Sequence, residues 1–407
     1  MPLSSLLRRS LLNNLRSLPL RSFSSGGGTP ISFTLSVEPE PEPDSEPETP
    51  SPNDDLRSRI FRLRFPKRSA TSALDKWVGE GNTVAQSELR QIAKDLNRSK
   101  RYKHALEISE WMKSHQEYQL SDSDYAMRID LITKVFGVNA AEEFFEGLPS
   151  TAKSCDVYTA LLHAYARGKL VEKAENLFER IKESNFSPNA LTYNEMMTLY
   201  MSVGQLEKVP LVIEELKRKE VAPDLFTYNL WISASAASLD VKGVRKILDE
   251  MSHSSNIHEG WKTYIKLADI YVTAGHLMSS DNSLVGAEKK ISQREWITYD
   301  FLIILYSGLG NKEGINEIWK SLKMISQKMT GRNYACILSS YLVLGQLKEA
   351  GQVIDEWTQS KVLEFDLSAC NRLLDAIVKA GLLEVAESFQ GLMLQRNYKL
   401  SSSLDDQ

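Results

Sequence analysis

The sequence contains a pattern that repeats about every 35 residues. Equivalent positions, which we call anchors, are occupied mostly by tyrosine, at Leu89, Tyr125, Tyr158, Tyr193, Tyr228, Tyr264, Tyr299, Tyr334 and Cys370. Successive anchors lie 33 to 36 residues apart over eight steps. A period of this length, kept so many times, is typical of an array of stacked units rather than of one globular core.

Two further columns keep the same register. Eleven residues after the anchor stand Gly204, Gly275, Gly310, Gly345 and Gly381, while Gly168 comes one residue early. Sixteen residues after the anchor stand Ala105, Ala141, Ala174, Ala350 and Ala386. Glycine predicts the break between two helices, and a column of alanine predicts that two helices approach closely there.

Between the breaks, apolar residues recur with helical spacing, as from Leu170 to Ile181. Each repeat is therefore predicted to be a helix, a glycine turn and a second helix, with the anchors in the core. One such hairpin cannot bury both of its apolar faces, whereas about nine stacked hairpins share a continuous core. The pattern predicts an all-α solenoid with a long concave groove.

Composition and charge narrow the function only weakly. Hydrophobic residues make up 42% and charged residues 25% of the 407 positions, as in soluble globular proteins. The formal net charge is −4, and the chain after residue 68 carries −6, so total charge does not predict a polyanionic partner. Cys155, Cys336 and Cys370 show no Cys-x-x-Cys spacing, and no apolar run reaches 18 residues. Neither a zinc site, a disulfide framework nor a membrane span is expected.

Residues 1–36 have the pattern of a mitochondrial transit peptide. They contain no acid and carry Arg8, Arg9, Arg16 and Arg21 among leucines and serines, with cleavage expected near Phe23. A chloroplast address and a basic tail without an address are the alternatives. The prediction places the mature protein in the mitochondrial matrix.

The segments that flank the repeats are predicted from composition. Residues 37–56 alternate proline and acid, which predicts a disordered linker. Residues 57–86 are expected to form a basic flank and a lead-in helix, and residues 401–407 a disordered tail. The six basic residues of 57–68 are interpreted as a solvated flank, with contact to a phosphate backbone as the alternative.

Several short motifs accompany the period. "TYN" opens the first helix at 192–194 and 227–229, "AG-x-L" stands at the turn at 274–277 and 380–383, and "PD" closes a repeat at 223–224. With this period, the chain over about 87–400 resembles the pentatricopeptide repeat family. The lead-in at 74–112 resembles the short, pure-repeat (P-type) plant mitochondrial branch of that family. The resemblance implies a right-handed superhelical solenoid of about nine helix-turn-helix units.

The resemblance also implies a ligand. In this family one repeat reads one base of single-stranded RNA with the residue after the anchor and the last residue of the repeat. Carried onto this chain, Thr159 with Asn189 matches adenine, and Asn194 with Asp224 matches uracil, with Asp224 accepting from Asn194 to orient its amide. Asn229 favours a pyrimidine but lacks a matching partner.

The remaining pairs match no readable combination; they are Arg90/Ser121, Ala126/Ser154, Asn229/Gly260, Ile265/Glu295, Asp300/Thr330 and Ala335/Asp366. Leu191 and Phe226 are expected to sandwich a base. Asn189 and Asp224 have a second interpretation, because Asn and Asp after a proline at a helix start are also preferred N-caps.

Two functions are consistent with these patterns. The first is a single-stranded RNA-binding protein that acts on the stability, processing or translation of an organellar transcript. The second is a protein-interaction scaffold on the same solenoid, for example on the mitochondrial ribosome. The six histidines are dispersed and no catalytic motif is present, so no enzyme activity, cofactor, metal or small-molecule substrate is expected.

Overall fold

The computed structural model describes residues 55–63, 69–184, 186–253, 259–277, 287–324, 330–360 and 363–401, the side chains of 287–296 excepted. These residues are mostly helical, and no strand occurs among them. The described residues divide into two compact parts, 55–164 and 165–401, which we call the N-terminal and C-terminal parts. The predicted transit peptide, nearly all of the linker, and residues 402–407 of the tail lie outside the described residues.

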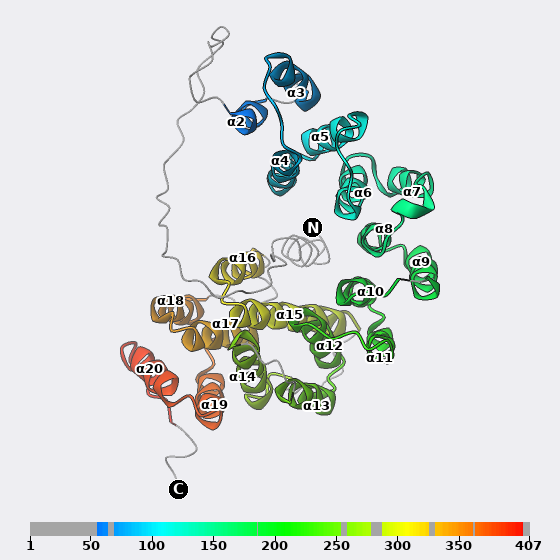
Figure 1. The fold of residues 1–407 in the computed structure, drawn as a ribbon. Coiled ribbons are helices and arrows are strands. Elements are labelled where there is room, and N and C mark those ends of the chain that lie inside the picture. The colour runs from blue at the N-terminus through cyan, green and yellow to red at the C-terminus, as the bar shows by residue number, and fades with distance from the viewer. Residues whose placement is uncertain are drawn as a thin grey trace. The chain divides into compact units, whose positions relative to one another are not determined.

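The N-terminal part is a series of short helices. They are α2 (Leu56–Phe61), α3 (Ala70–Gly79), α4 (Gln86–Arg98), α5 (Tyr102–Ser114), α6 (Asp122–Phe136), α7 (Val138–Glu146), the 3-10 helix η1 (Ser150–Ala152) and α8 (Cys155–Gly168), within which the boundary between the parts falls. Helices α4 with α5 and α6 with α7 form the predicted hairpins, and α5 packs on α6 (Figure 1).

The C-terminal part continues in the same way. Its helices are α9 (Val171–Glu183), α10 (Ala190–Val203), the 3-10 helix η2 (Leu206–Lys208), α11 (Val209–Arg218), α12 (Leu225–Ala237), α13 (Val241–Ser252), α14 (Glu259–Thr273), α15 (Ala287–Gly308), α16 (Lys312–Lys323), α17 (Gly331–Val343), α18 (Leu347–Thr358), α19 (Leu367–Lys379) and α20 (Leu383–Leu394). Helices α10, α12, α15, α17 and α19 each pack on the next in this order (Figure 1).

In eight of the nine repeats, the turn after the first helix falls at the same distance from the anchor. Eight residues that stand eleven positions after an anchor have positive φ: Lys100, Lys169, Gly204, Leu239, Gly275, Gly310, Gly345 and Gly381. The repeat anchored at Tyr125 turns one residue later, at Gly137. The turn of the Tyr158 repeat was predicted from the sequence at Gly168, and this prediction was wrong. Gly168 ends α8, and the residue with positive φ is Lys169, at 58°.

The predicted core columns are present. All five alanines of the small-residue column are buried. Seven of the nine anchors are buried as well, whereas Tyr125 and Tyr158 are half-buried. Tyr193, for example, meets Phe178 of α9 edge-on with ring centroids 5.5 Å apart. The anchors thus occupy the core between helices, as their period predicted.

One repeat departs from the predicted pattern. Helix α15 starts twelve residues before its anchor Tyr299, whereas most first helices start three residues before theirs. It packs against both α12 and α14, and α13 packs on α14, so that α12 to α15 close into a group of four helices (Figure 1). Helices α14 and α15 cross at two glycines, where a Cβ on Gly308 would lie 2.8 Å from the carbonyl oxygen of Gly260.

The fixed turn generates a stability prediction. Leu239 is 48% exposed and adopts φ 58°, a conformation that costs an L-residue about 1–2 kcal/mol. Leu239→Gly should raise the free energy of unfolding by about 0.5–1 kcal/mol, because the strain exceeds the added chain entropy of glycine. Urea denaturation measures the change. Leu211→Gly, at an exposed leucine inside α11, is the matched control and should instead destabilise by about 1 kcal/mol.

The alanine column generates a second prediction. Ala350 is fully buried where α18 packs in its hairpin with α17. Ala350→Phe should cost about 1–3 kcal/mol by overpacking this contact, and the C-terminal repeats should loosen before the rest, because each repeat is stabilised by its neighbours. Limited proteolysis should then cut first within the last repeats. Unchanged cleavage, or loss of the whole chain in one step, would contradict the prediction.

Candidate nucleic-acid interface

The residues that directly follow the first eight anchors form a column, which we call the reader column: Arg90, Ala126, Thr159, Asn194, Asn229, Ile265, Asp300 and Ala335. Each lies in the first helix of its repeat. Four of them, Arg90, Asn194, Asn229 and Asp300, hydrogen-bond to a residue that lies in or caps the first helix of the following repeat. The reader column is therefore a polar seam between neighbouring repeats.

Asn194 and Asp224 meet as the sequence predicted. Asn194 in α10 is 1% exposed, and its Nδ2 donates to Asp224 Oδ1 at 3.3 Å. Since a carboxylate can only accept, the amide nitrogen must face Asp224. The amide oxygen of Asn194 is buried and has no hydrogen-bond partner. The pair thus presents one unsatisfied acceptor.

Asp224 is also a helix cap. Its Oδ1 accepts from the backbone N–H of Thr227 at 2.6 Å and from the Thr227 hydroxyl at 2.7 Å, and the Asp224 N–H bonds back to that hydroxyl. Asn189 caps α10 through the N–H of Thr192 at 3.3 Å. Capping and amide orientation are therefore combined in Asp224, and the two interpretations drawn from the sequence do not exclude each other.

The other candidate residues differ in exposure. Thr159 in α8 is buried, and Asn229 in α12 is buried with its Oδ1 accepting from the Tyr264 hydroxyl at 3.1 Å. Leu191 and Phe226 occupy the same position in consecutive repeats, but Leu191 is 41% exposed and Phe226 only 7%. Of these two expected stacking residues, Leu191 is the one that presents its side chain to solvent.

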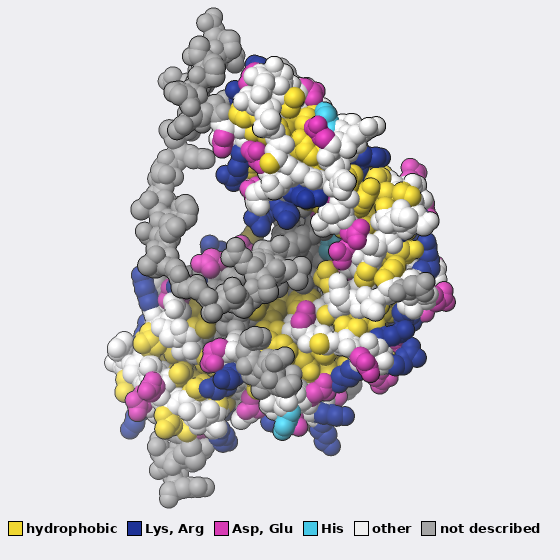
Figure 2. All heavy atoms as spheres, in the orientation of Figure 1, with side chains coloured by type: hydrophobic (Ala, Val, Ile, Leu, Met, Phe, Trp, Pro, Cys, Tyr) yellow, Lys and Arg dark blue, Asp and Glu magenta, His cyan; other side chains and the backbone are white. Residues whose placement is uncertain are grey.

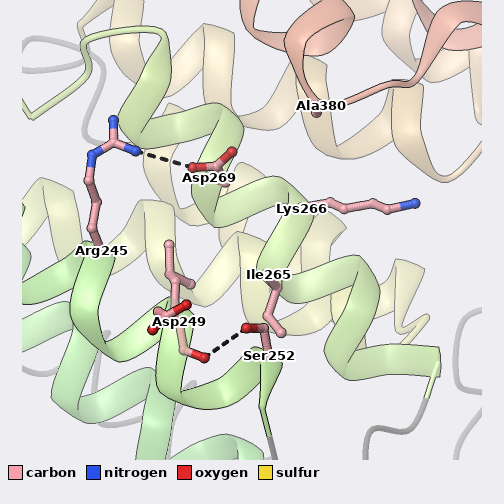
Figure 3. Close-up of a pocket in the computed structure, with 8 residues that line it drawn as sticks. Arg245, Asp249, Ser252, Ile265, Lys266, Asp269 and Ala380 are labelled. Carbon is pink, nitrogen blue, oxygen red and sulfur yellow. Dashed lines mark hydrogen bonds and ion pairs between the residues drawn. The ribbon is translucent and has the colours of Figure 1, made fainter.

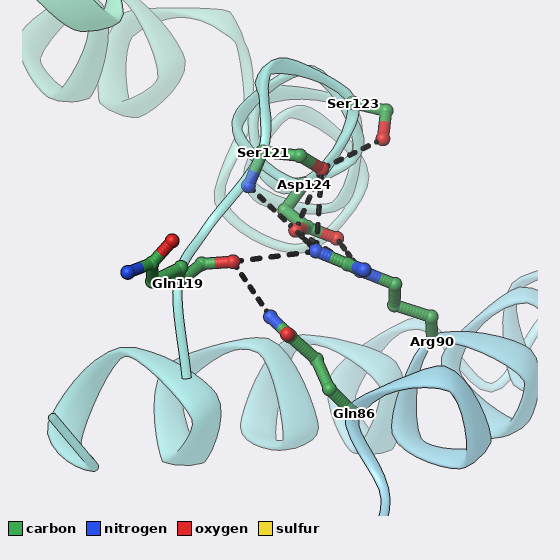
Figure 4. Close-up of polar contacts among 6 residues, drawn as sticks. All are labelled: Gln86, Arg90, Gln119, Ser121, Ser123 and Asp124. Carbon is green, nitrogen blue, oxygen red and sulfur yellow. Dashed lines mark hydrogen bonds and ion pairs between the residues drawn. The ribbon is translucent and has the colours of Figure 1, made fainter. Parts of the chain in front are cut away.

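Arg90 is engaged in a charge pair (Figure 4). Its Nε lies 3.0 and 3.1 Å from the two carboxylate oxygens of Asp124, and its Nη2 lies 2.6 Å from Oδ2. The same Nη2 reaches the carbonyl of Gln119 and the hydroxyl of Ser121. Burial acts to raise the pKa of Asp124, but the hydrogen bonds from Arg90 and Ser121 outweigh it and lower the pKa.

Asp300 is engaged in a second charge pair. It is fully buried in α15 and accepts from the Tyr271 hydroxyl at 2.7 Å, from Asn333 Nδ2 at 2.7 Å and from Arg332 Nε at 3.1 Å. Burial raises the pKa of Asp300 and prevails over the opposing effect of Arg332 and the hydrogen bonds. Both Arg90 and Asp300 are thus occupied by oppositely charged residues of the next repeat.

The Arg90–Asp124 and Asp300–Arg332 ion pairs were not predicted from the sequence. The signal was present, because Arg90 and Asp124, and Asp300 and Arg332, are opposite charges separated by nearly one period. Residues one period apart lie on neighbouring first helices, so a charge facing its opposite at that spacing indicates an ion pair across the seam.

Ile265 lies beside an open pocket. It lines this pocket, of about 320 Å³, together with Arg245, Leu248, Asp249, Ser252, Lys266, Asp269 and Ala380 (Figure 3). Arg245 and Asp269 form an ion pair at 3.5 Å across it. Two cations and two carboxylates line the pocket, so its charges balance.

The described residues contain no group of three histidine, cysteine or acidic side chains placed to hold a metal ion. No described helix combines the length and the apolar character that crossing a bilayer requires.

Comparison with known proteins agrees with the repeat architecture. Sequence profiles of the PPR repeat family match residues 154–197 and 188–237, and the PPR repeat profile matches 226–255. A mitochondrial pentatricopeptide repeat-containing protein of Arabidopsis thaliana is 55% identical over 351 residues, which are 86% of this chain and 86% of that protein. The chain belongs to the pentatricopeptide repeat family. Another mitochondrial member from Arabidopsis thaliana is 33% identical over 85% of this chain and 70% of its own length.

Solved structures of pentatricopeptide repeat solenoids are also similar. The pentatricopeptide repeat protein PPR10 in complex with an 18-nucleotide psaJ RNA element is 14% identical, with a TM-score of 0.36 over 81% of this chain and 52% of that one. Yeast Rmd9p in complex with a 16-nucleotide target RNA is 11% identical, with a TM-score of 0.26 over 83% and 67%. The two RNA molecules are ligands of PPR10 and of Rmd9p.

The Arg90 pair generates a pH prediction. Because the pKa of Asp124 is lowered in the folded state, its stabilising effect is full above its ordinary value of 3.8 and is lost as the pH falls through the lowered pKa. Asp124→Asn should cost about 2 kcal/mol at pH 7 and should flatten the loss of stability between about pH 5 and pH 2.

Denaturation at a series of pH values measures both effects. Asp269→Asn is the matched control, because the Arg245–Asp269 pair is half-exposed and should contribute less than about 1 kcal/mol. Equal effects of the two substitutions would contradict a special role for the Arg90 pair.

Proposed function

We propose that this protein is a mitochondrial single-stranded RNA-binding protein that acts on the stability, processing or translation of a transcript. The observation that carries the proposal is the unsatisfied amide oxygen of Asn194, oriented by Asp224 in the seam between two repeats. A buried acceptor without a partner is costly, and a ligand that supplies a donor removes that cost.

Uracil fits this acceptor better than cytosine. The middle group of the pairing edge is N3, which carries a hydrogen in uracil and a lone pair in cytosine. The N3–H of uracil can donate to Asn194 Oδ1, whereas the lone pair of cytosine would face the lone pairs of the oxygen. The orientation fixed by Asp224 therefore favours uracil.

Access to Asn194 requires a local opening, because the side chain is buried in the free protein. The exposed Leu191 at the start of α10 offers an apolar surface on which an entering base can stack, with Phe226 at the same position of the next repeat. Stacking contributes about 1–3 kcal/mol per base, enough to offset a modest separation of side chains.

The bases follow from the repeat order. Thr159 with Asn189 is assigned adenine from its sequence, Asn194 with Asp224 uracil, and Asn229 a pyrimidine. With the N-terminal repeats toward the 5′ end, as the family resemblance implies, the preferred core is A, U and a pyrimidine. The mitochondrial names of two relatives and the acid-free, arginine-bearing residues 1–36 support the location.

A protein-interaction scaffold, for example on the mitochondrial ribosome, is the second candidate. Two observations favour it: the charge pairs at Arg90 and Asp300 occupy two reader positions, and basic and acidic side chains are interspersed on the face shown in Figure 2. Mixed surface charge is less suited to a polyanion than a continuous basic stripe would be.

An exchange of the reading pair tests the RNA proposal. Asn194→Thr with Asp224→Asn keeps a capping residue at the start of α12 and reproduces the pair found at Thr159 and Asn189. The wild-type protein should prefer U over A at that base by about tenfold, and the variant should prefer A. Gel-shift titration of both proteins against RNAs that differ only at that base measures the preference, with salt held constant because backbone contacts depend on it.

Asp366→Asn is the control for the cap, because Asp366 caps α19 through Ala369 N–H at 2.9 Å while its reader residue, Ala335, offers no polar group. This variant should keep the wild-type preference. If wild type and exchange variant bind both RNAs equally, or neither binds at all, the RNA proposal is wrong and the scaffold takes its place.

A further inference from the structure

The two reader asparagines of consecutive repeats are held by partners of opposite polarity. Asn194 donates its Nδ2 to Asp224, whereas Asn229 accepts at its Oδ1 from the hydroxyl of Tyr264 at 3.1 Å. The amide atom that remains without a partner is consequently the oxygen in Asn194 and the nitrogen in Asn229. The Nδ2 of Asn229 makes no hydrogen bond that the structure records among its described residues.

Tyr264 takes this position because the usual partner is excluded. The last residue of the repeat, which corresponds to Asp224, is Gly260 in the first turn of α14. A Cβ on Gly260 would fall inside contact distance of the carbonyl oxygen of Gly308, where α14 crosses α15. No side chain can orient Asn229 from that position, and the hydroxyl of Tyr264 does so from one turn further along α14.

The direction of this hydrogen bond follows from the surroundings of Tyr264. Its side chain is fully buried, and the described residues provide its hydroxyl with one polar partner, Asn229. Burial raises the pKa of the hydroxyl well above its ordinary value, so the group keeps its proton. If the amide nitrogen of Asn229 faced the hydroxyl instead, the proton of the buried hydroxyl would be left without a partner.

We propose that Tyr264 is a positioning residue that makes Asn229 present its NH₂ group, so that this repeat selects cytosine over uracil. The inference rests on the proposed function and specifies one base of it. The lone pair on N3 of cytosine can accept from Asn229 Nδ2, whereas the N3–H of uracil would face a second donor. Two asparagines at equivalent positions thereby select different pyrimidines.

Gel-shift titration with RNAs that carry A-U-C or A-U-U in a constant flank tests the inference. The wild-type protein should bind A-U-C about tenfold more tightly, as expected for one mismatched donor. Tyr264→Phe keeps the ring and removes the hydroxyl, which frees the amide to turn. The preference for C should fall to about twofold or less, while the preference for U at the preceding base is retained.

Tyr228→Phe is the matched control. Tyr228 is also an anchor, and its hydroxyl donates to Glu250 at 3.2 Å, away from the reader column. This variant loses a comparable hydrogen bond and should discriminate between C and U as the wild type does.

Asn229→Asp provides an independent variant should Tyr264→Phe fail to fold by circular dichroism. A carboxylate at this position still accepts from Tyr264 but presents an acceptor to the base, so the preference should reverse to U. Retained discrimination in Tyr264→Phe, or an Asn229→Asp protein that still prefers C, overturns the inference.

The same titrations separate this inference from the proposed function. A wild-type protein that selects A and U at the first two bases but binds C and U equally at the third contradicts the role of Tyr264 alone. A wild-type protein that selects none of the three bases contradicts both.

Discussion

The described repeats depend on one backbone feature, the residue with positive φ that follows the first helix. Because this residue stands eleven positions after the anchor in nearly every repeat, the two helices of each hairpin meet in the same register. The alanine five residues later then lies where the helices touch, and the anchor lies in the core. The regularity is strong enough to hold Lys100, Lys169 and Leu239 in a conformation that normally favours glycine.

The constant register has a second consequence, which concerns the residue after the anchor. When the anchor points into the core, its neighbour points toward the next repeat, and this is where Arg90, Asn194, Asn229 and Asp300 make their hydrogen bonds. The position serves cohesion between repeats in all four cases. The proposed recognition of a base would use the same side chains, at the positions where the bond to the next repeat leaves one polar group without a partner.

Much of this could be predicted from the sequence, because the decisive signals are periodic. The period located the hairpins, the buried anchors and the alanine column, whereas the Asn194–Asp224 bond was predicted from the family resemblance, which pairs the residue after the anchor with the last residue of the repeat. The turn at Lys169 was missed because glycine was taken as the cause of the turn, whereas the register determines it. The crossing of α14 and α15 was also not predicted from the sequence. The repeat pattern does not bring Gly260 and Gly308 together, although the two glycines are in contact.

The strength of each bond in the seam determines where a base can enter. Breaking the Arg90–Asp124 pair would leave a buried carboxylate without its cation, at a cost of about 3–5 kcal/mol. The Asn194–Asp224 bond is single and 3.3 Å long, and when it opens Asp224 remains exposed and bonded to Thr227. Stacking of one base contributes about 1–3 kcal/mol. This free energy is enough to replace the Asn194–Asp224 bond but not the Arg90–Asp124 pair. If the protein binds RNA as proposed, a base would therefore enter more readily beside an asparagine than beside a charge pair, and base reading would be confined to the repeats between Arg90 and Asp300.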